Sequence, residues 1–367
     1  MDVGPAARWL IERPAATRGY AIDTTHAFET PPPVLRTGLG VRVCGLGHYL
    51  PEALITNDDL SRMVDTTDEW IFPRTGIRSR HIAGDHQATS DLATAAGARA
   101  LADAGTAPED IDLLIIATAT PDSPVPPTAV LVQRNLALHN AAGMDLSAAC
   151  AGFVFAAHTA AAMIRSGLHR RALVIGAETL TRMTNYQDRQ SCILFGDAAG
   201  AIVLGPMTSE GGLELIYSHV GSDGRHSEII RVVAGGSRKP ASAETIAAQE
   251  HFLTLKGSEV FRRAVEAMTE QGRRALDELG LTIADLRWVI PHQANVRIMN
   301  AVAAALGAHE SQLISDIATV GNTSAASLPL ALSRLRERGE TLQRGERVML
   351  LTFGAGSTWG CQVYEQT

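Results

Sequence analysis

An internal repeat limits the possible folds of this chain more than any other feature of its sequence. Residues 99–115 recur without a gap 175 residues later, at positions 274–290. The two copies share an Arg-Ala-Leu triplet, a glycine, an acidic residue followed by an aliphatic one, and an isoleucine. Each copy predicts a helix, a glycine cap, a short acidic turn and a buried strand. Solenoid repeats are far shorter, so an offset of nearly half the chain indicates two similar halves.

The composition is typical of a globular α/β enzyme packed with aliphatic side chains. Hydrophobic residues make up 46% of the 367 residues, aromatic residues 5% and charged residues 19%. Predicted strands and helices alternate, which favours mainly parallel sheets covered by helices. We expect an N-terminal arm of low order over residues 1–37, a first half over 38–207 and a second half over 208–367.

Charge and cysteine usage exclude several classes of partner. The net charge is −7 and no basic run is interleaved with aromatic residues, so we expect no nucleic-acid partner. No uncharged stretch approaches the length of a membrane span, and the first residues lack the form of a signal peptide. The four cysteines are far apart and form no CxxC pair, which predicts neither a metal site nor a disulfide framework. We therefore expect a cytoplasmic protein without membrane contact.

The first candidate catalytic residue is Cys150, within the stretch DLSAACAGFVFAAHTAAAM. A predicted strand ends there and a long, almost uncharged helix begins. A thiol at the first turn of a helix feels the positive end of the helix dipole, which favours the thiolate. Taken alone, a single cysteine is more often a small core residue than a nucleophile.

The second half supplies polar residues at matching places. His292 directly follows a predicted strand, and Asn322 stands at the start of a helix that corresponds to the helix behind Cys150. A lone histidine or asparagine is usually a satisfied core group or a helix cap. Here, however, all three residues lie at strand ends or helix starts of a duplicated α/β body, where clefts form.

A loop-rich stretch near the N-terminus carries Trp70 and Arg74. One interpretation is a solvated surface with an anchoring tryptophan. The other is the mouth of a site for a flat-ringed, phosphate-bearing ligand, because tryptophan and arginine stack on aromatic rings and arginine pairs with phosphate.

Four motifs together resemble a known family. DLSAACAGF, PHQAN, GNTSAAS and FGAGSTWG, in this order and spacing, are similar to those of β-ketoacyl-acyl carrier protein synthase III among the thiolase-fold condensing enzymes. The resemblance extends from about Leu39 to the C-terminus. It implies an α/β thiolase-like five-layer αβαβα fold built from two duplicated halves, a homodimer, and a triad of Cys150, His292 and Asn322.

The resemblance also implies an activity. Cys150 would take an acyl group from acyl-coenzyme A, which is a substrate and not a resident cofactor. The malonyl group of malonyl-acyl carrier protein would then lose carbon dioxide, and His292 and Asn322 would stabilise the resulting enolate as hydrogen-bond donors. Backbone N–H groups of Cys150 and Ala355 would bind the tetrahedral oxyanion. The product would be a β-ketoacyl thioester that initiates fatty acid or polyketide biosynthesis.

Binding residues transfer from the family position by position. Trp70 and Arg189 match the pair that sandwiches the adenine of coenzyme A, Arg74 matches a nucleotide contact, and Asn295 matches a pantetheine contact. The family often has a bulky aromatic residue at the position of Val125, where it reaches into the partner subunit's acyl pocket. A valine leaves more space, so we expect acyl groups longer or more branched than acetyl.

One departure concerns the carrier protein. The helix after PHQAN lacks the lysines with which some members dock the acidic carrier, although Arg262 and Arg297 are present.

Three alternatives stay open from the sequence. A thiolase-fold acyltransferase would pass the acyl group from Cys150 to an alcohol or amine without forming a carbon–carbon bond, and malonyl decarboxylation distinguishes it. A thiol hydrolase uses the same three residue types, but the papain-type signature around the cysteine is absent. A non-catalytic partner subunit would not be expected to keep all three polar residues.

Overall fold

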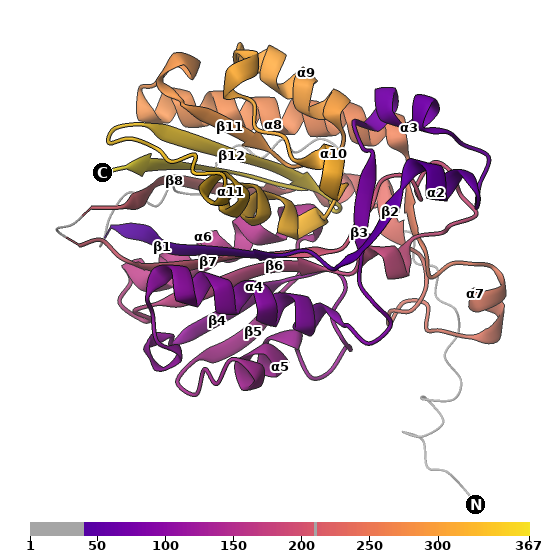
Figure 1. Ribbon diagram of the computed structural model, residues 1–367, viewed down its shortest axis with the longest axis horizontal. Helices are drawn as coiled ribbons and strands as arrows, with labels where there is room; N and C mark the ends of the chain where they lie inside the picture. The colour runs from indigo at the N-terminus through magenta and orange to yellow at the C-terminus, as the bar shows by residue number, and fades with distance from the viewer. Residues whose placement is uncertain (1–39, 209–210) are drawn as a thin grey trace, which may run out of the picture. The chain divides into compact units, whose positions relative to one another are not determined.

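The computed structural model of the protein describes residues 40–208 and 211–367. The arm predicted at residues 1–37 lies outside the described residues. The described residues belong to one compact unit, in which helices and strands alternate along the chain (Figure 1).

A large mixed sheet forms the centre of the fold. Its nine strands lie in the order β11 (Trp288–Pro291), β12 (Arg347–Gly354), β13 (Thr358–Gln366), β8 (Leu213–Ser222), β1 (Val41–Tyr49), β7 (Ala198–Pro206), β6 (Ala172–Glu178), β4 (Leu113–Ala117) and β5 (Ala142–Leu146). Strands β4, β6 and β7 are almost entirely buried apolar runs, as expected for strands covered by helices on both faces.

The sheet consists of two similar parts joined by a short contact. In one part β5, β4 and β6 are parallel and β7 and β1 are antiparallel to their neighbours. In the other part β11 and β12 are parallel and β13 and β8 are antiparallel to their neighbours, while Leu313 bridges β11 in the place of β5. Strands β1 and β8 pair only through Arg42 with Glu214 and Val43 with Leu213.

The repeated residues form equivalent elements in the two parts. Helix α4 (Thr89–Ala104) ends at Gly105 and helix α8 (Gly257–Leu279) ends at Gly280, with left-handed φ angles of 55° and 67°. A short 3₁₀ helix and a buried strand follow each glycine: η1 (Pro108–Asp110) and β4 in the first copy, and η5 (Ile283–Asp285) and β11 in the second. The predicted order of helix, glycine cap, turn and strand is confirmed, whereas the boundary at residues 207 and 208 stays a prediction.

Helices divide the structure into five layers. Helices α4 and α5 (Thr128–Asn135) cover the outer face of the first part, and α8 and α9 (Val296–Leu306) cover the outer face of the second. Helices α6 (Gly152–Arg165) and α11 (Ser327–Glu337) lie between the two parts (Figure 1). The five-layer αβαβα architecture expected from the resemblance is therefore confirmed.

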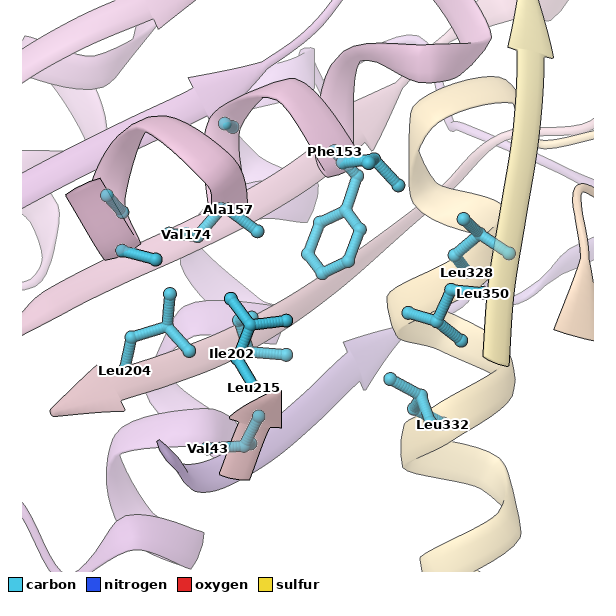
Figure 2. Close-up of a cluster of buried hydrophobic side chains, with 14 of the residues drawn as sticks. Val43, Phe153, Ala157, Val174, Ile202, Leu204, Leu215, Leu328, Leu332 and Leu350 are labelled. Carbon is cyan, nitrogen blue, oxygen red and sulfur yellow. The ribbon is translucent and has the colours of Figure 1, made fainter. Parts of the chain in front are cut away.

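The middle layer is a dense core shared by both parts. Figure 2 shows Phe153 of α6 near Val174 and Ile202 on one side and Leu328 and Leu350 on the other. Full burial of each such side chain contributes roughly 1.5–3 kcal/mol. The packing also brings the two parts together at β6, where a Cβ on Gly176 would lie 2.2 Å from the carbonyl oxygen of Ala325. Only glycine permits this approach.

Smaller elements lie outside the central sheet. They are the antiparallel pair of β2 (Ala53–Thr56) and β3 (Ser79–Ile82), helices α2 (Asn57–Ser61), α3 (Asp68–Thr75), α7 (Ala243–Ala247) and α10 (Ile317–Val320), and the antiparallel pair of β9 (Ile230–Val232) and β10 (Leu253–Leu255). Across the described ranges, no helix has the length and apolar character needed to cross a membrane.

Candidate active site

Cys150 lies in a strained turn between a strand and a helix. Strand β5 ends at Leu146, the 3₁₀ helix η2 (Ala149–Ala151) follows, and α6 begins at Gly152. Ala149 has a φ of 48°, in the left-handed region that residues other than glycine rarely adopt. Such strain is maintained where the surrounding structure fixes a functional group, and here it presents the half-buried Cys150 to a cavity.

The second half contains an equivalent turn, displaced by the same 175 residues. It comprises η7 (Ser324–Ala326), in which Ser324 has a φ of 49°, and the start of α11 at Ser327. The two turns are in contact with each other between the two parts of the sheet. Asn322 and Ser324 of the second turn therefore reach the cavity that contains Cys150.

Asn322 is held so that its amide nitrogen is the available group. Its side-chain Oδ1 accepts a hydrogen bond from the backbone N–H of Ser324 at 2.9 Å. Its backbone is paired with Leu194 and Gly196. The carbonyl end of the amide is thus occupied by the turn that leads into η7, and the NH₂ end keeps its donors for a ligand.

His292 is a neutral ring in the buried part of the site. It follows β11, and its Nδ1 lies 2.7 Å from Oγ of Ser327. Burial lowers the pKa of His292 to about 4, so the ring is uncharged at neutral pH. When the Ser327 hydroxyl donates to Nδ1, the ring proton resides on Nε2, and that nitrogen is a hydrogen-bond donor.

The turn between β12 and β13 packs directly on the backbone of Cys150. A Cβ on Gly354 would lie 2.8 Å from the nitrogen of Cys150, so this approach requires glycine. Thr352 Oγ1 donates to the carbonyl of Cys150 at 3.0 Å. Thr358 Oγ1 lies 3.0 Å from the carbonyl oxygens of both Ala148 and Ala355. These contacts fix the positions of the Cys150 and Ala355 backbones relative to each other.

Burial opposes ionisation of the nucleophile. It raises the pKa of the Cys150 thiol to about 11, and a hydrogen bond from Ser324 acts in the opposite direction. The helix dipole predicted at this turn favours the thiolate, whereas burial favours the protonated thiol. With its pKa raised to about 11, the thiol keeps its proton at neutral pH, so the proton has to leave during the reaction.

One cavity of about 400 Å³ unites the predicted triad. Cys150, His292, Asn322 and Ala355 all line it, together with Asn295. Most of the other walls are apolar and come from three places: the β9–β10 strand pair, the first half of α8, and the segment after β6. The residues are Ile230, Val232, Leu253, Leu255, Val260, Met268, Leu180 and Met183. The cavity suits an acyl chain or a pantetheine arm better than a charged ligand. The described residues contain no cluster of His, Cys, Asp or Glu that could hold a metal ion.

Comparisons with known proteins agree with this geometry. The family profile 3-oxoacyl-[acyl-carrier-protein (ACP)] synthase III matches residues 144–224, and the profile of its C-terminal part matches residues 276–366. The β-ketoacyl-[acyl-carrier-protein] synthase III of Symbiobacterium thermophilum is 47% identical over 87% of this chain and 96% of that protein. The enzyme of the same name from Thiobacillus denitrificans is 44% identical over 87% of this chain and 97% of that protein.

This chain belongs to the β-ketoacyl-[acyl-carrier-protein] synthase III family. It is therefore an acyl-transferring condensing enzyme.

Solved structures agree with the assignment to the synthase III family. The 3-oxoacyl-[acyl-carrier-protein] synthase III of Aquifex aeolicus superposes with a TM-score of 0.81 at 38% identity, over 89% of this chain and all of that one. The priming β-ketosynthase from the R1128 polyketide biosynthetic pathway superposes with a TM-score of 0.82 at 36% identity, over 92% of this chain and 99% of that one.

The residues predicted to bind coenzyme A separate into two groups. Trp70, Arg74 and Arg189 meet outside the cavity walls, with the guanidinium carbons of Arg74 and Arg189 at 4.6 and 4.7 Å from the Trp70 ring centre. Arg189 is also held by the carbonyl of Asp65 at 3.0 Å. An adenine stacked between Trp70 and Arg189 needs about 3.5 Å on each of its faces. The present distance of 4.7 Å leaves no room for it, so Arg189 has to move away from Trp70 when the adenine binds. Asn295 instead lies in the cavity wall and caps α9.

Val125 belongs neither to the cavity wall nor to the cluster of Trp70, Arg74 and Arg189. Its side chain is 82% exposed, and it does not line the cavity of its own chain.

Sequence reasoning missed several residues of the synthase III site. Ser324 and Ser327 lie in the GNTSAAS motif but were not assigned a role, although both contact catalytic candidates. Ile230 and Val232, which were not among the predicted site residues, also line the cavity. The apolar alternation of β9 and β10 was the available signal, but each strand has only three residues.

Proposed function

We propose that Cys150 accepts an acyl group from acyl-coenzyme A and condenses it with the malonyl group of malonyl-acyl carrier protein, with loss of carbon dioxide. The observation that carries this proposal is that a thiol, a neutral imidazole and a donating amide line one apolar cavity. Cys150 attacks the thioester carbon, and the backbone N–H groups of Cys150 and Ala355 bind the oxyanion. Each such donor typically contributes two to three orders of magnitude in rate.

The second half of the reaction uses His292 and Asn322. As the malonyl group loses carbon dioxide, negative charge accumulates on its thioester oxygen. Two neutral donors suit this step because they stabilise the developing charge without an ion pair in the ground state. The resulting carbanion attacks the acyl group on Cys150 and releases the β-ketoacyl product.

Coenzyme A is a substrate in this proposal, and no resident cofactor takes part. Its adenine stacks against Trp70 and its pantetheine arm passes Asn295, with Arg74 and Arg189 near the nucleotide phosphates. This assignment is supported by the clustering of the two arginines on the Trp70 ring.

The protein acts as a homodimer in which Val125 contributes to the acyl pocket of the partner subunit. Support comes from the 82% exposure of the Val125 side chain, the highest among the exposed large apolar side chains of the described residues, which leaves it free to contact a partner subunit. A cytosolic location is supported by the four cysteines, none of which forms a disulfide.

The test pre-loads Cys150 from a panel of acyl-coenzyme A primers and follows the intact protein mass. Malonyl-acyl carrier protein and malonyl-coenzyme A are then added, and carbon dioxide and β-ketoacyl product are measured. Release of both supports the proposal. Loading without carbon dioxide release contradicts it and favours acyl transfer to an alcohol or amine. Cys150→Ala should not load, whereas Cys44→Ser, outside the cavity, should load normally.

A further inference from the structure

Arg80, on strand β3, is a buried cation that the mechanism above does not use. Its side chain is 1% exposed. Within the described residues, no carboxylate forms an ion pair with it, and the titratable groups that act on its pKa, Tyr186 and Cys192, are uncharged at neutral pH. Burial lowers the pKa of Arg80 to about 10, so the guanidinium stays charged. A buried cation without a counter-charge is costly, and its contacts therefore need an explanation.

The guanidinium of Arg80 donates hydrogen bonds to two separate parts of the structure. Nη1 donates to the carbonyl of Ile55 on β2 at 3.3 Å and to Oδ1 of Asn57, the first residue of α2, at 3.0 Å. Nη2 donates to the carbonyl of Ile193 at 2.8 Å. Ile193 lies between Arg189 and the next stretch of the cavity wall. Because charged donors make the stronger hydrogen bonds, Arg80 joins the start of α2 firmly to the segment that carries Arg189.

Asn57 extends these contacts to helix α3. The side chain of Asn57 is buried, and its Nδ2 donates to Oδ1 of Asp68 at 2.8 Å and to the carbonyl of Ile77 at 2.7 Å. Asp68 is the first residue of α3, the helix that carries Trp70, and Ile77 follows the glycine that ends it. Since Arg80 occupies the oxygen of the Asn57 amide, both N–H donors point toward α3. One amide thus connects Arg80 to the two ends of this helix.

The two sides of the Trp70 and Arg189 cluster therefore share one polar anchor. A small apolar cluster also joins α2, α3 and the Arg189 segment: Leu60, Ile71, Cys192 and Ile193 are its buried members, and Trp70 packs against them. Apolar contacts are not directional, so they hold the elements together without fixing their orientation. The hydrogen bonds of Arg80 and Asn57 have fixed donor and acceptor directions, so they set how α3 faces the segment that carries Arg189.

The base of the Arg80 side chain is fixed beside the catalytic turn. A Cβ on Gly196 would lie 3.0 Å from the Cβ of Arg80, and a Cβ on Gly321 would lie 3.2 Å from it. These two glycines border the backbone of Asn322, whose carbonyl accepts a hydrogen bond from the N–H of Gly196 at 3.0 Å. The side chain of Arg80 thus begins at a tightly packed part of the active site, which gives its guanidinium a defined position.

We propose that Arg80 is a positioning residue that sets the orientation of Trp70 and Arg189 for the nucleotide of coenzyme A. It touches neither the substrate nor the reacting atoms and acts through Asn57 and Ile193. Arg189 has to move when the adenine binds, and the hydrogen bond at Ile193 keeps the cavity end of its segment in place during that movement. A site oriented in advance binds its ligand more tightly, because less ordering accompanies binding.

The test titrates coenzyme A into the full-length protein under reducing conditions and measures Kd by calorimetry. Arg80→Met keeps a long side chain but removes the charge and every donor, so we expect Kd to rise by about tenfold or more. Loading of Cys150 from an acyl-pantetheine thioester, which has no nucleotide, should stay within about threefold of the wild-type rate. Arg80→Lys keeps the charge and a donor, and its Kd should rise less than that of Arg80→Met.

A double-mutant cycle with Trp70 shows whether Arg80 acts through the mouth of the site. Trp70→Ala removes the stacking partner and should itself raise the Kd for coenzyme A. When Arg80→Met is added to Trp70→Ala, Kd should rise by less than about threefold further, because the oriented pair is already lost. If Arg80→Met has its full effect in the Trp70→Ala protein, the proposal is overturned.

Arg165→Met is the matched control. Arg165 is half-buried and donates to the carbonyl of Leu215 at 2.7 Å, but it lies at the end of α6 remote from Cys150. It should bind coenzyme A with the wild-type Kd.

Two results for Arg80→Met would contradict the positioning role. One is an unchanged Kd, and the other is an equal loss of acyl-pantetheine loading, which indicates a general structural role. If Arg80→Met does not fold, Asp68→Ala decides by the same criteria. It breaks the link between Asn57 and α3 at a partly exposed carboxylate.

The positioning role of Arg80 rests on the proposed function, since it concerns the binding of coenzyme A, but the two can fail separately. Titration of coenzyme A involves no acyl transfer and no malonyl group. Binding that depends on Arg80, without carbon dioxide release, would contradict the proposed condensation alone. Condensation with a Kd that does not depend on Arg80 would contradict the positioning role alone.

Discussion

At the scale of single residues, the groups that hold each catalytic candidate determine what it can do. Asparagine and histidine can each donate or accept hydrogen bonds. Asn322 becomes a donor because Ser324 occupies its oxygen, and the ring of His292 stays neutral because it is buried. The chemistry therefore depends on neighbours as much as on residue type.

Asn322→Asp tests the donor role. Aspartate keeps the cap on the N–H of Ser324 but replaces the amide donor by an acceptor. We expect malonyl decarboxylation to fall by about two to three orders of magnitude, while loading of Cys150 changes by only a few fold. Intact mass measures loading, and released carbon dioxide measures the second step.

The matched control for this prediction is Asn295→Asp. Asn295 lines the same cavity, but its predicted contact is with pantetheine. It should raise the KM for the primer more than it lowers the rate of decarboxylation. Equal losses of loading and decarboxylation in Asn322→Asp would contradict a role specific to the enolate.

At the scale of elements, the two equivalent turns and the β12–β13 turn build the site by close backbone approach. Gly354 belongs to that approach, since its Cβ would meet the nitrogens of Cys150 and Ala151 at 2.8 and 3.0 Å. A side chain there has to push the turn away from η2. The oxyanion donors would then separate, although the triad side chains would stay in place.

Gly354→Ala should therefore impair both acyl transfers. We expect the rate of Cys150 loading to fall by about two to three orders of magnitude. Stopped reactions analysed by intact mass provide the measurement. Gly236→Ala is the control, because a Cβ there meets no atom within 4 Å, and it should load at the wild-type rate. Normal loading in Gly354→Ala would show that the turn does not supply the donors.

The elements also show what the sequence could and could not predict. Local periodicity and glycine caps predicted the repeated helix and strand around Gly105 and Gly280, and motif order indicated the triad. The sequence indicated the effect of the helix dipole on Cys150 but not the burial that raises its pKa, because the dipole is a local property and burial a tertiary one. The walls from β9 and β10 were missed, since three-residue strands carry little pattern.

At the scale of the whole molecule, two buried groups oppose each other in the pH dependence of stability. The pKa of His292 is lowered from 6.5 to about 4, so its stabilising contribution is present above pH 6.5 and is lost as the pH falls through 4. The pKa of Glu178 is raised from 4.5 to about 7, so its contribution is present below pH 4.5 and is lost as the pH rises through 7. Each shift corresponds to about 3 kcal/mol, in opposite directions.

Glu178→Gln removes one side of this balance. Its free energy of unfolding relative to the wild type should increase by about 2–3 kcal/mol between pH 5 and pH 8, because His292 contributes equally to both proteins. Denaturant unfolding followed by circular dichroism at the two pH values measures this. The exposed Glu52→Gln serves as control, with the same difference from wild type at both pH values. A constant difference for Glu178→Gln would show that Glu178 does not titrate in this range.

Selectivity for the acyl group is a property of the assembled molecule if Val125 reaches the partner's pocket. A phenylalanine at this position would fill space that the valine leaves open. Val125→Phe should therefore lower kcat/KM for a branched five-carbon primer relative to acetyl-coenzyme A by about tenfold or more, since each methylene of mismatch changes selectivity by roughly tenfold or above. Leu168→Phe, at another exposed apolar residue, should leave the ratio unchanged.

A mixed dimer tests whether the effect crosses the interface. One chain carries both Val125→Phe and Cys150→Ala, so it cannot react, and the other chain is wild type. The active Cys150 then has a valine in its own chain and a phenylalanine in its partner. If Val125 lines the partner's pocket, the mixed dimer should have the primer selectivity of the Val125→Phe protein. Wild-type selectivity would place the acyl chain entirely within one subunit, and the size of the pocket would then depend on the walls from β9, β10 and α8.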